Sequence, residues 1–176
     1  MVKYITETSR LLLREIQKDD YQSVREILQD MEIMYAWEHT FSDSEVSDWI
    51  SENLLRYDRD GYSYWAVIEK MSNQFIGVCG LISEKAEDES HVGIGYIFHK
   101  KYWGRGYAVE SARACADYAF HTLKLNEVTA QIRPDNLSSI KVAEKLGMTV
   151  RKQFIRKYRG KEIPHLLYAL SMPKRI

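Results

Sequence analysis

The sequence has few cysteines and prolines, and no long run of uncharged residues. It holds two cysteines, Cys79 and Cys115, and three prolines in 176 residues. Two cysteines do not make a disulfide framework, and their scarcity is typical of a reducing cytoplasm. The longest run without a charged residue, 71–83, contains Ser, Asn, Gln and Gly, which excludes a membrane span. The first residues, Met-Val-Lys-Tyr-Ile-Thr-Glu, lack the apolar core of a signal peptide, so we expect a cytoplasmic protein.

The composition is that of a folded chain. Hydrophobic residues make up 45% of it and charged residues 28%, and its 12 Tyr, 5 Phe and 4 Trp argue against disorder. A mass of 20.7 kDa is enough for one domain with a sizeable core. No repeat, low-complexity tract or linker divides the chain. We therefore predict a single domain over residues 1–176.

The net charge is zero, but the charges are unevenly distributed. Residues 1–70 carry a balance of −7, whereas residues 141–176 carry a balance of +8. One interpretation is that a single domain has two oppositely charged surfaces. The other is that the acidic part attracts a cationic substrate and the basic part attracts phosphates. The sequence leaves both interpretations open.

Hydrophobic periodicity predicts a strand and two helices in the first part of the chain. Three consecutive leucines in 10–16 are typical of a buried strand. Asp19-Asp20 offer N-cap chemistry for a helix with its apolar side chains on one face. The segment 42–61 opens with a Ser-Asp-Ser-Glu capping box and ends at a glycine, as a helix does. The intervening 31–41 lacks periodicity, and either covers the core or forms a wall of the substrate site.

From residue 64 the pattern favours strands, with helices expected at 107–121 and from Asn136 to Gly147. The acidic connection 83–90 is expected to be a solvated loop. The order of elements predicts an α/β (α+β) fold, with a mixed, mainly antiparallel central sheet flanked by helices and a C-terminal β-hairpin. The strands are expected at 64–69, 75–82, 92–98, 127–133, 153–158 and 166–170.

The stretch from Gly95 to Ala108 runs from a strand through a glycine-bearing loop into a helix. Glycines let a backbone approach an anion, and a helix start offers free N–H groups, so this pattern favours a phosphate or pyrophosphate. Val109 does not fit a dinucleotide fingerprint, and Gly106-Tyr107-Ala108 does not fit a Walker P-loop. Taken alone, the loop could also be a structural turn.

Several motifs in this order resemble the GNAT N-acetyltransferases, and most closely the RimJ/RimL-like branch, over residues 10–170. The resemblance implies a GNAT fold, acetyl-CoA as cosubstrate, and transfer of acetyl to a primary amine, in this branch the N-terminal amine of a protein. The matching segments are Lys101-Tyr102-Trp103-Gly104-Arg105-Gly106, Asn136-x-x-Ser139, Glu144 to Met148, Arg10 to Arg14, and Phe75 to Leu81.

The resemblance also implies which residues hold acetyl-CoA. Main-chain groups of Ile97, Phe98 and His99 would pair with the pantetheine arm. Asn136 would contact the pantetheine, with Ser139 near the sulfur, although Asn136 is also suited to cap a helix. Lys101 stands where the family has Gln or Arg, so a cation is kept without planar donor geometry. The N–H groups expected to cradle the pyrophosphate are those of Gly104, Arg105, Gly106, Tyr107 and Ala108.

The catalytic residues depart from the family pattern. Gly93 stands where relatives often carry a glutamate, and Ala143 stands where many carry a tyrosine acid. His91, two residues before Gly93, shares its strand face and has a suitable ordinary pKa for a base, but it is also what an exposed strand start would show. Ser139 is the candidate acid. Two further carboxylates, Glu84 and Glu89, are reserve candidates for the base, although both are expected to be solvated loop charges, and no metal is expected.

Two other functions compete with an enzyme. A non-catalytic acyl-CoA-binding sensor would fit the loss of the usual base and acid. An RNA-binding module would use the basic segment 151–161, which an exposed strand also explains. The sequence specifies neither the acceptor, which could be a protein N-terminus, polyamine, sugar or antibiotic amine, nor whether the chain forms a homodimer. It predicts no membrane partner and no nucleic acid for the enzyme.

Overall fold

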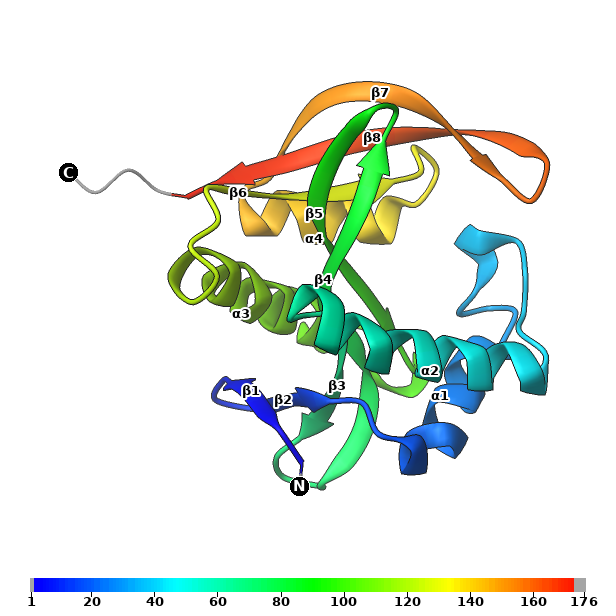
Figure 1. Cartoon of the computed structure of the whole chain (residues 1–176), viewed down its shortest axis with the longest axis vertical. Coiled ribbons are helices and arrows are strands. Elements are labelled where there is room, and N and C mark those ends of the chain that lie inside the picture. The colour runs from blue at the N-terminus through cyan, green and yellow to red at the C-terminus, as the bar shows by residue number, and fades with distance from the viewer. Residues whose placement is uncertain (1, 173–176) are drawn as a thin grey trace.

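The computed structural model describes residues 2–172 and has one eight-stranded sheet as its framework (Figure 1). The strands lie in the order β1-β2-β3-β4-β5-β6-β8-β7. Every pairing is antiparallel except that of β5 with β6, which is parallel, so the predicted mixed and mainly antiparallel sheet is confirmed. Their bounds are β1 Tyr4–Glu7, β2 Leu11–Glu15, β3 Tyr64–Glu69, β4 Gln74–Ala86, β5 Glu89–Phe98, β6 Glu127–Ile132, β7 Thr149–Tyr158 and β8 Lys161–Ser171.

Helices cover both faces of this sheet. Side chains alternate between the faces along each strand, and those of β3 alternate between two core clusters. The larger cluster contains the buried side chains of α3 and α4, and the smaller contains those of α1 with Val46 and Ile50 of α2. The helices are α1 Tyr21–Leu28, α2 Asp43–Asp60, α3 Tyr107–His121 and α4 Leu137–Leu146.

The helix boundaries follow the capping signals in the sequence. The Ser42 hydroxyl accepts from the Glu45 N–H and the Glu45 carboxylate accepts from the Ser42 N–H, which completes the predicted capping box. Gly61 and Gly147 end α2 and α4 with positive φ, a conformation that glycine adopts without steric cost. The Asp20 expectation was wrong in detail, because its carboxylate binds the Arg14 guanidinium instead of capping α1.

Parallel strands β5 and β6 meet at one point only. Their single bridge joins Gly93 to Thr129, and beyond it the two strands diverge. The cavity described below lies along the diverging part of β5. The position of this bridge therefore sets where the inner end of the site lies.

The predicted loop at 83–90 was wrong. Strands β4 and β5 pair without a break from Gly77–Phe98 to Ala86–Glu89, so only Glu87 and Asp88 form the turn. The tip of this hairpin is held by a small core of Ala86, Phe154 and Leu167, which links it to β7 and β8. Distant residues thus stabilise a segment whose own sequence is acidic. Strand β1 was also absent from the sequence prediction.

Candidate acetyl-CoA and acceptor site

A cavity of about 400 Å³ lies between the C-terminal half of β5 and the first turns of α3 and α4. Tyr96, Ile97 and Phe98 line it from β5, and the segment 31–41 lines its outer side through Tyr35 and Trp37. Its surface is mainly apolar, with hydroxyl and amide groups at α4. Such a space suits an elongated ligand with an apolar arm.

One end of the cavity is an anion cradle made of backbone. Gly104 and Gly106 adopt φ of +74° and +79°, which turns the loop tightly into α3. The N-cap of α3 is Gly106, and no side chain caps this helix start. The N–H groups of the first helical turn have no intrahelical acceptor, and the helix dipole places positive charge there. The cradle can therefore bind a pyrophosphate, as the sequence predicts.

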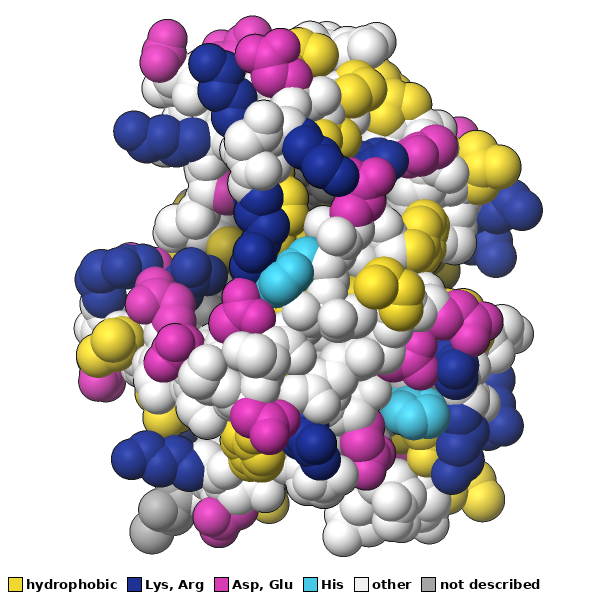
Figure 2. Space-filling view, turned by 90° about the vertical axis from the view of Figure 1, so that its right-hand side faces the viewer, with side chains coloured by type: hydrophobic (Ala, Val, Ile, Leu, Met, Phe, Trp, Pro, Cys, Tyr) yellow, Lys and Arg dark blue, Asp and Glu magenta, His cyan; other side chains and the backbone are white. Residues whose placement is uncertain are grey.

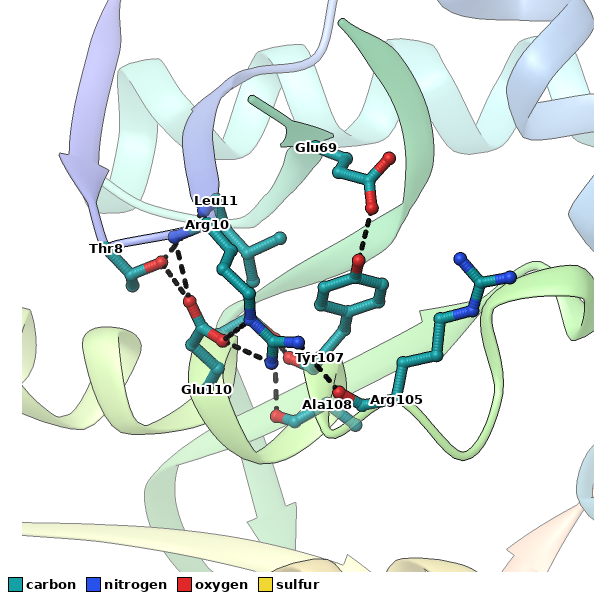
Figure 3. A network of polar contacts seen from close by, with 9 residues as sticks. Thr8, Arg10, Leu11, Glu69, Arg105, Tyr107, Ala108 and Glu110 are labelled. Carbon is teal, nitrogen blue, oxygen red and sulfur yellow. Dashed lines mark hydrogen bonds and ion pairs between the residues drawn. The ribbon is translucent and has the colours of Figure 1, made fainter. Parts of the chain in front are cut away.

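Arg10 fixes this loop from the turn between β1 and β2 (Figure 3). Its guanidinium donates to the Arg105 carbonyl at 3.0 Å, lies 4.5 Å from the centre of the Tyr107 ring, and pairs with Glu110. Burial alone would raise the pKa of Glu110, but hydrogen bonds from Thr8 and Arg10 hold it below its ordinary value. The network ties the glycine loop to a distant part of the chain.

The start of α4 presents polar groups to the same cavity. The Asn136 carboxamide oxygen accepts from the Ser139 N–H, so this residue is the helix cap. The same oxygen accepts from the Tyr35 hydroxyl at 2.7 Å, and the Ser139 carbonyl accepts from the Tyr96 hydroxyl at 3.2 Å. Burial raises the pKa of Tyr96, so its hydroxyl keeps its proton at neutral pH. Two hydroxyls, those of Ser139 and Tyr96, therefore belong to residues that line this part of the cavity.

Most of the predicted cofactor-binding residues line the cavity. Three do not: His99, Lys101 and Arg105 flank it. The His99 ring accepts from the Lys101 N–H at 3.2 Å, and the Lys101 ammonium lies over the Tyr102 ring. Those that line it are Ile97, Phe98, Gly104, Gly106, Tyr107, Ala108, Asn136 and Ser139.

The candidate bases surround Gly93. His91 is not the exposed strand-start residue that was one alternative, because its side chain is only 8% exposed and its buried Nε2 lies 3.4 Å from a carboxylate oxygen of Glu89. Glu84 was expected to be a solvated loop charge, which was wrong: it lies opposite His91 within the paired hairpin and is largely buried. Glu89 is exposed, as expected.

The acidic and basic parts of the chain meet beside this site. Segment 31–41 lies next to the tip of the β7–β8 hairpin (Figure 1). Glu38 pairs with Lys161 at 3.2 Å, and Glu45 pairs with Arg159 at 2.8 Å. Figure 2 shows Lys and Arg side chains directly beside Asp and Glu side chains on this face. The acidic and basic parts are therefore joined by ion pairs on this face, where they do not form two separate surfaces of opposite charge.

Sequence reasoning did not assign Tyr35 or Tyr96 to the site, and it left open whether segment 31–41, which holds Trp37, covers the core or forms a wall of the substrate site. Tyr35 and Trp37 lie in a segment without periodicity, and their place beside α4 depends on contacts across about a hundred residues. Tyr96 follows the strand pattern, but only the structure shows that its hydroxyl reaches the α4 start. The Gly-Tyr pair at 95–96 was the one available signal.

The chain is similar to known acetyltransferases. A family model described as "Acetyltransferase (GNAT) domain" matches residues 10–149. The uncharacterized protein YkkB of Bacillus subtilis is 34% identical over 150 residues, which cover 82% of this chain and 87% of that protein. A GNAT-family acetyltransferase structure from Bacillus anthracis matches with a TM-score of 0.82 and 27% identity, covering 96% of this chain and 98% of the other.

A further structure supports the fold alone. It is RimL, named as a ribosomal L7/L12 alpha-N-protein acetyltransferase in complex with coenzyme A, and it matches with a TM-score of 0.81 at 17% identity. The match covers 97% of this chain and 98% of RimL. The predicted likeness to the RimJ/RimL-like branch is thus present in the fold. Separately, none of the helices in residues 2–172 combines the length and apolar character needed to cross a membrane.

Proposed function

Since the chain belongs to the GNAT family of acetyltransferases and acetyl-CoA is the acetyl donor of that family, we propose that it acetylates the N-terminal amine of a peptide or protein. The amine attacks the thioester directly in a ternary complex. The observation that carries this proposal is the cavity that runs from the α3 anion cradle toward the point where β5 and β6 diverge. A pyrophosphate at the cradle would leave the pantetheine arm directed along β5.

The residues present fit this donor. The open N–H groups at Gly106 and Tyr107 suit the diphosphate, and the apolar walls of Ile97 and Phe98 suit the pantetheine. A thioester is an activated acyl donor, so no enzyme nucleophile is required. The chain's own contribution is to orient the thioester, to take a proton from the amine, and to hydrogen-bond the departing thiolate.

We propose Ser139 as the group that hydrogen-bonds the departing thiolate, with the Tyr96 hydroxyl beside it. Ala143 offers no side-chain proton, whereas Ser139 and Tyr96 both line the cavity and are joined by the hydrogen bond from the Tyr96 hydroxyl to the Ser139 carbonyl. We propose that the base is His91 or Glu84, which pair across the β4–β5 hairpin, and of these Glu84 contacts position 93. An oxyanion donor on the β5 backbone would complete the set.

A peptide N-terminus is proposed over a small amine for two reasons. The sequence resembles the branch whose members acetylate protein N-termini, and the fold matches RimL, which is named an alpha-N-protein acetyltransferase. We further propose that the whole chain acts as one N-acetyltransferase domain in the cytoplasm. Its support is the continuous sheet and the free state of its two cysteine thiols.

An acceptor screen tests this proposal. The protein is incubated with acetyl-CoA and a panel of short peptides with free or blocked N-termini, polyamines and amino sugars, and thiol release is followed. We expect turnover with unblocked peptides and background rates with their blocked counterparts. Turnover with a polyamine or sugar alone would overturn the peptide assignment, and turnover with none of the panel would overturn the proposed function.

A further inference from the structure

The side chain of Glu84 occupies the space that glycine leaves open at position 93. A Cβ atom added to Gly93 would lie 2.1 Å from the Glu84 Oε1 and 2.7 Å from its Cδ. These distances are far shorter than any real contact, so a side chain at this position would displace the Glu84 carboxylate from its place. The carboxylate comes from β4 and reaches diagonally across to β5, because Glu84 pairs with His91 and Gly93 is two residues further along.

This carboxylate lacks the partners that a buried charge ordinarily has. Among residues 2–172 it forms no ion pair and no hydrogen bond. The ionisable groups that face it are His91 on β5, Tyr64 on β3 and Arg156 on β7. Burial raises the pKa of Glu84 to about 7, and the positive charge of Arg156 only partly opposes this. The two carboxylate oxygens are not completely buried, so an incoming group can reach them.

The position of the carboxylate matches the position of the chemistry. Gly93 is the residue at which β5 pairs with β6, and the β5 lining of the donor cavity begins three residues further on, at Tyr96, and continues to Phe98. An acyl group at the inner end of that cavity would therefore approach Gly93. Because Gly93 has no side chain, the Glu84 carboxylate lies directly against the β5 backbone at this residue. His91 is less suited, since its Nε2 is buried and faces the Glu89 carboxylate at 3.4 Å.

We propose that Glu84 is a catalytic residue that takes the proton from the acceptor ammonium, reaching over Gly93 from the neighbouring strand; this rests on the proposed amine acetylation. The ammonium N–H proton passes to the carboxylate, and the freed nitrogen lone pair forms the C–N bond at the thioester carbon. The C–S bond then breaks, and its electron pair leaves on the CoA sulfur. That thiolate takes the second amine proton, and Glu84 later releases its own to water.

The first test compares Glu84→Gln with Asp88→Asn, a variant at the exposed turn of the same hairpin. We expect Glu84→Gln to lower kcat/KM for the acceptor about 10²-fold or more, with acetyl-CoA affinity unchanged. In the wild type, kcat/KM should also rise with pH through an ionisation near 7 that Glu84→Gln abolishes. Asp88→Asn should match the wild type. A purely structural Glu84 would leave the shape of the pH profile unaltered.

The second test moves the carboxylate. Glu84→Ala empties the space above Gly93, so the double variant Glu84→Ala/Gly93→Glu has room for a carboxylate on β5. We expect it to recover about tenfold or more of the kcat/KM lost in Glu84→Ala. A loss of less than about fivefold in Glu84→Gln, with its pH profile unchanged, would overturn the role of Glu84 while leaving acetylation intact. Absence of wild-type turnover with every amine would overturn both.

Discussion

Arg10 donates a hydrogen bond through Nη1 to the carbonyl oxygen of Arg105 at 3.0 Å, although 95 positions separate the two residues. The contact fixes the backbone just before Gly106, where the anion cradle begins. Glu110 holds the same guanidinium from the first turn of α3. The β1–β2 turn thus supports the shape of a loop that it does not form.

Loss of this support should weaken donor binding. We expect Arg10→Ala to raise the Kd of acetyl-CoA about three- to tenfold, because the glycine loop is no longer held in the bound shape. Arg10→Lys should recover little, since an ammonium cannot donate to both Arg105 and Glu110 with the same planar geometry. Calorimetric titration measures both. Arg59→Ala, at an exposed pair with Asp60, is the control. If Arg10→Ala bound acetyl-CoA as tightly as the control variant, Arg10 would have no role in donor binding.

A side chain at Gly106 should block the cradle. We expect Gly106→Val to raise the Kd of acetyl-CoA tenfold or more, equivalent to about 1.4 kcal/mol, because a branched side chain is strained at φ +79° and would obstruct the pyrophosphate. Gly61→Val is a matched control: it has a similar φ of +81° at the end of α2 and open space around it. Both variants should lose stability, and only Gly106→Val should lose affinity. Equal affinities would mean that the loop is a turn without a ligand.

Ligand selectivity should follow the shape of the whole cavity. Acetyl-CoA and CoA should raise the melting temperature, because a ligand that binds only the native state stabilises it by mass action. NADH and ATP carry phosphates but no pantetheine arm for the apolar walls at Ile97 and Phe98, so they should raise it far less. Thermal shift measurements at equal concentrations test this. Equal shifts with all four ligands would contradict the assigned cavity.

The burial of Glu84 should also appear in the pH dependence of stability. Its pKa is raised from 4.5 to about 7 in the folded chain, so the ionised form is disfavoured by folding. The wild type therefore loses stability through this group as pH rises from about 4.5 to about 7, and the loss persists above. Glu84→Gln lacks this ionisation. Its melting temperature relative to the wild type should increase over that range and then level off, whereas a difference independent of pH would contradict a buried, unpaired carboxylate.

The local signals in the sequence predicted local structure well. The capping box at Ser42 and the glycine at 147 define helix ends through contacts within a few residues. The hairpin tip at 83–90 could not be predicted in this way. It is acidic and exposed on one side, and its strand character comes from pairing and from Phe154 and Leu167, far along the chain.

The candidate site likewise has one part that local sequence predicts and one part that depends on contacts between distant residues. Its phosphate cradle follows from glycines beside a helix start, which the sequence displays directly. The sequence offered Glu84 only as a reserve candidate, because the feature that supports its proposed role is a missing side chain on the adjacent strand. Only the pairing register of β4 with β5 brings the carboxylate over Gly93. A glycine in a strand is a signal of close approach, but it does not say by which residue.

Acetyl transfer to a primary amine is tested most directly with acetyl-CoA labelled in its acetyl group and a short peptide with a free N-terminus. The products are separated, and the label is located by mass spectrometry while CoA thiol is counted. We predict one labelled acetyl on the peptide N-terminal amine for each thiol released, and no labelled protein when the peptide is left out. Thiol release without labelled peptide, or label accumulating on the protein itself, would contradict direct transfer to the amine.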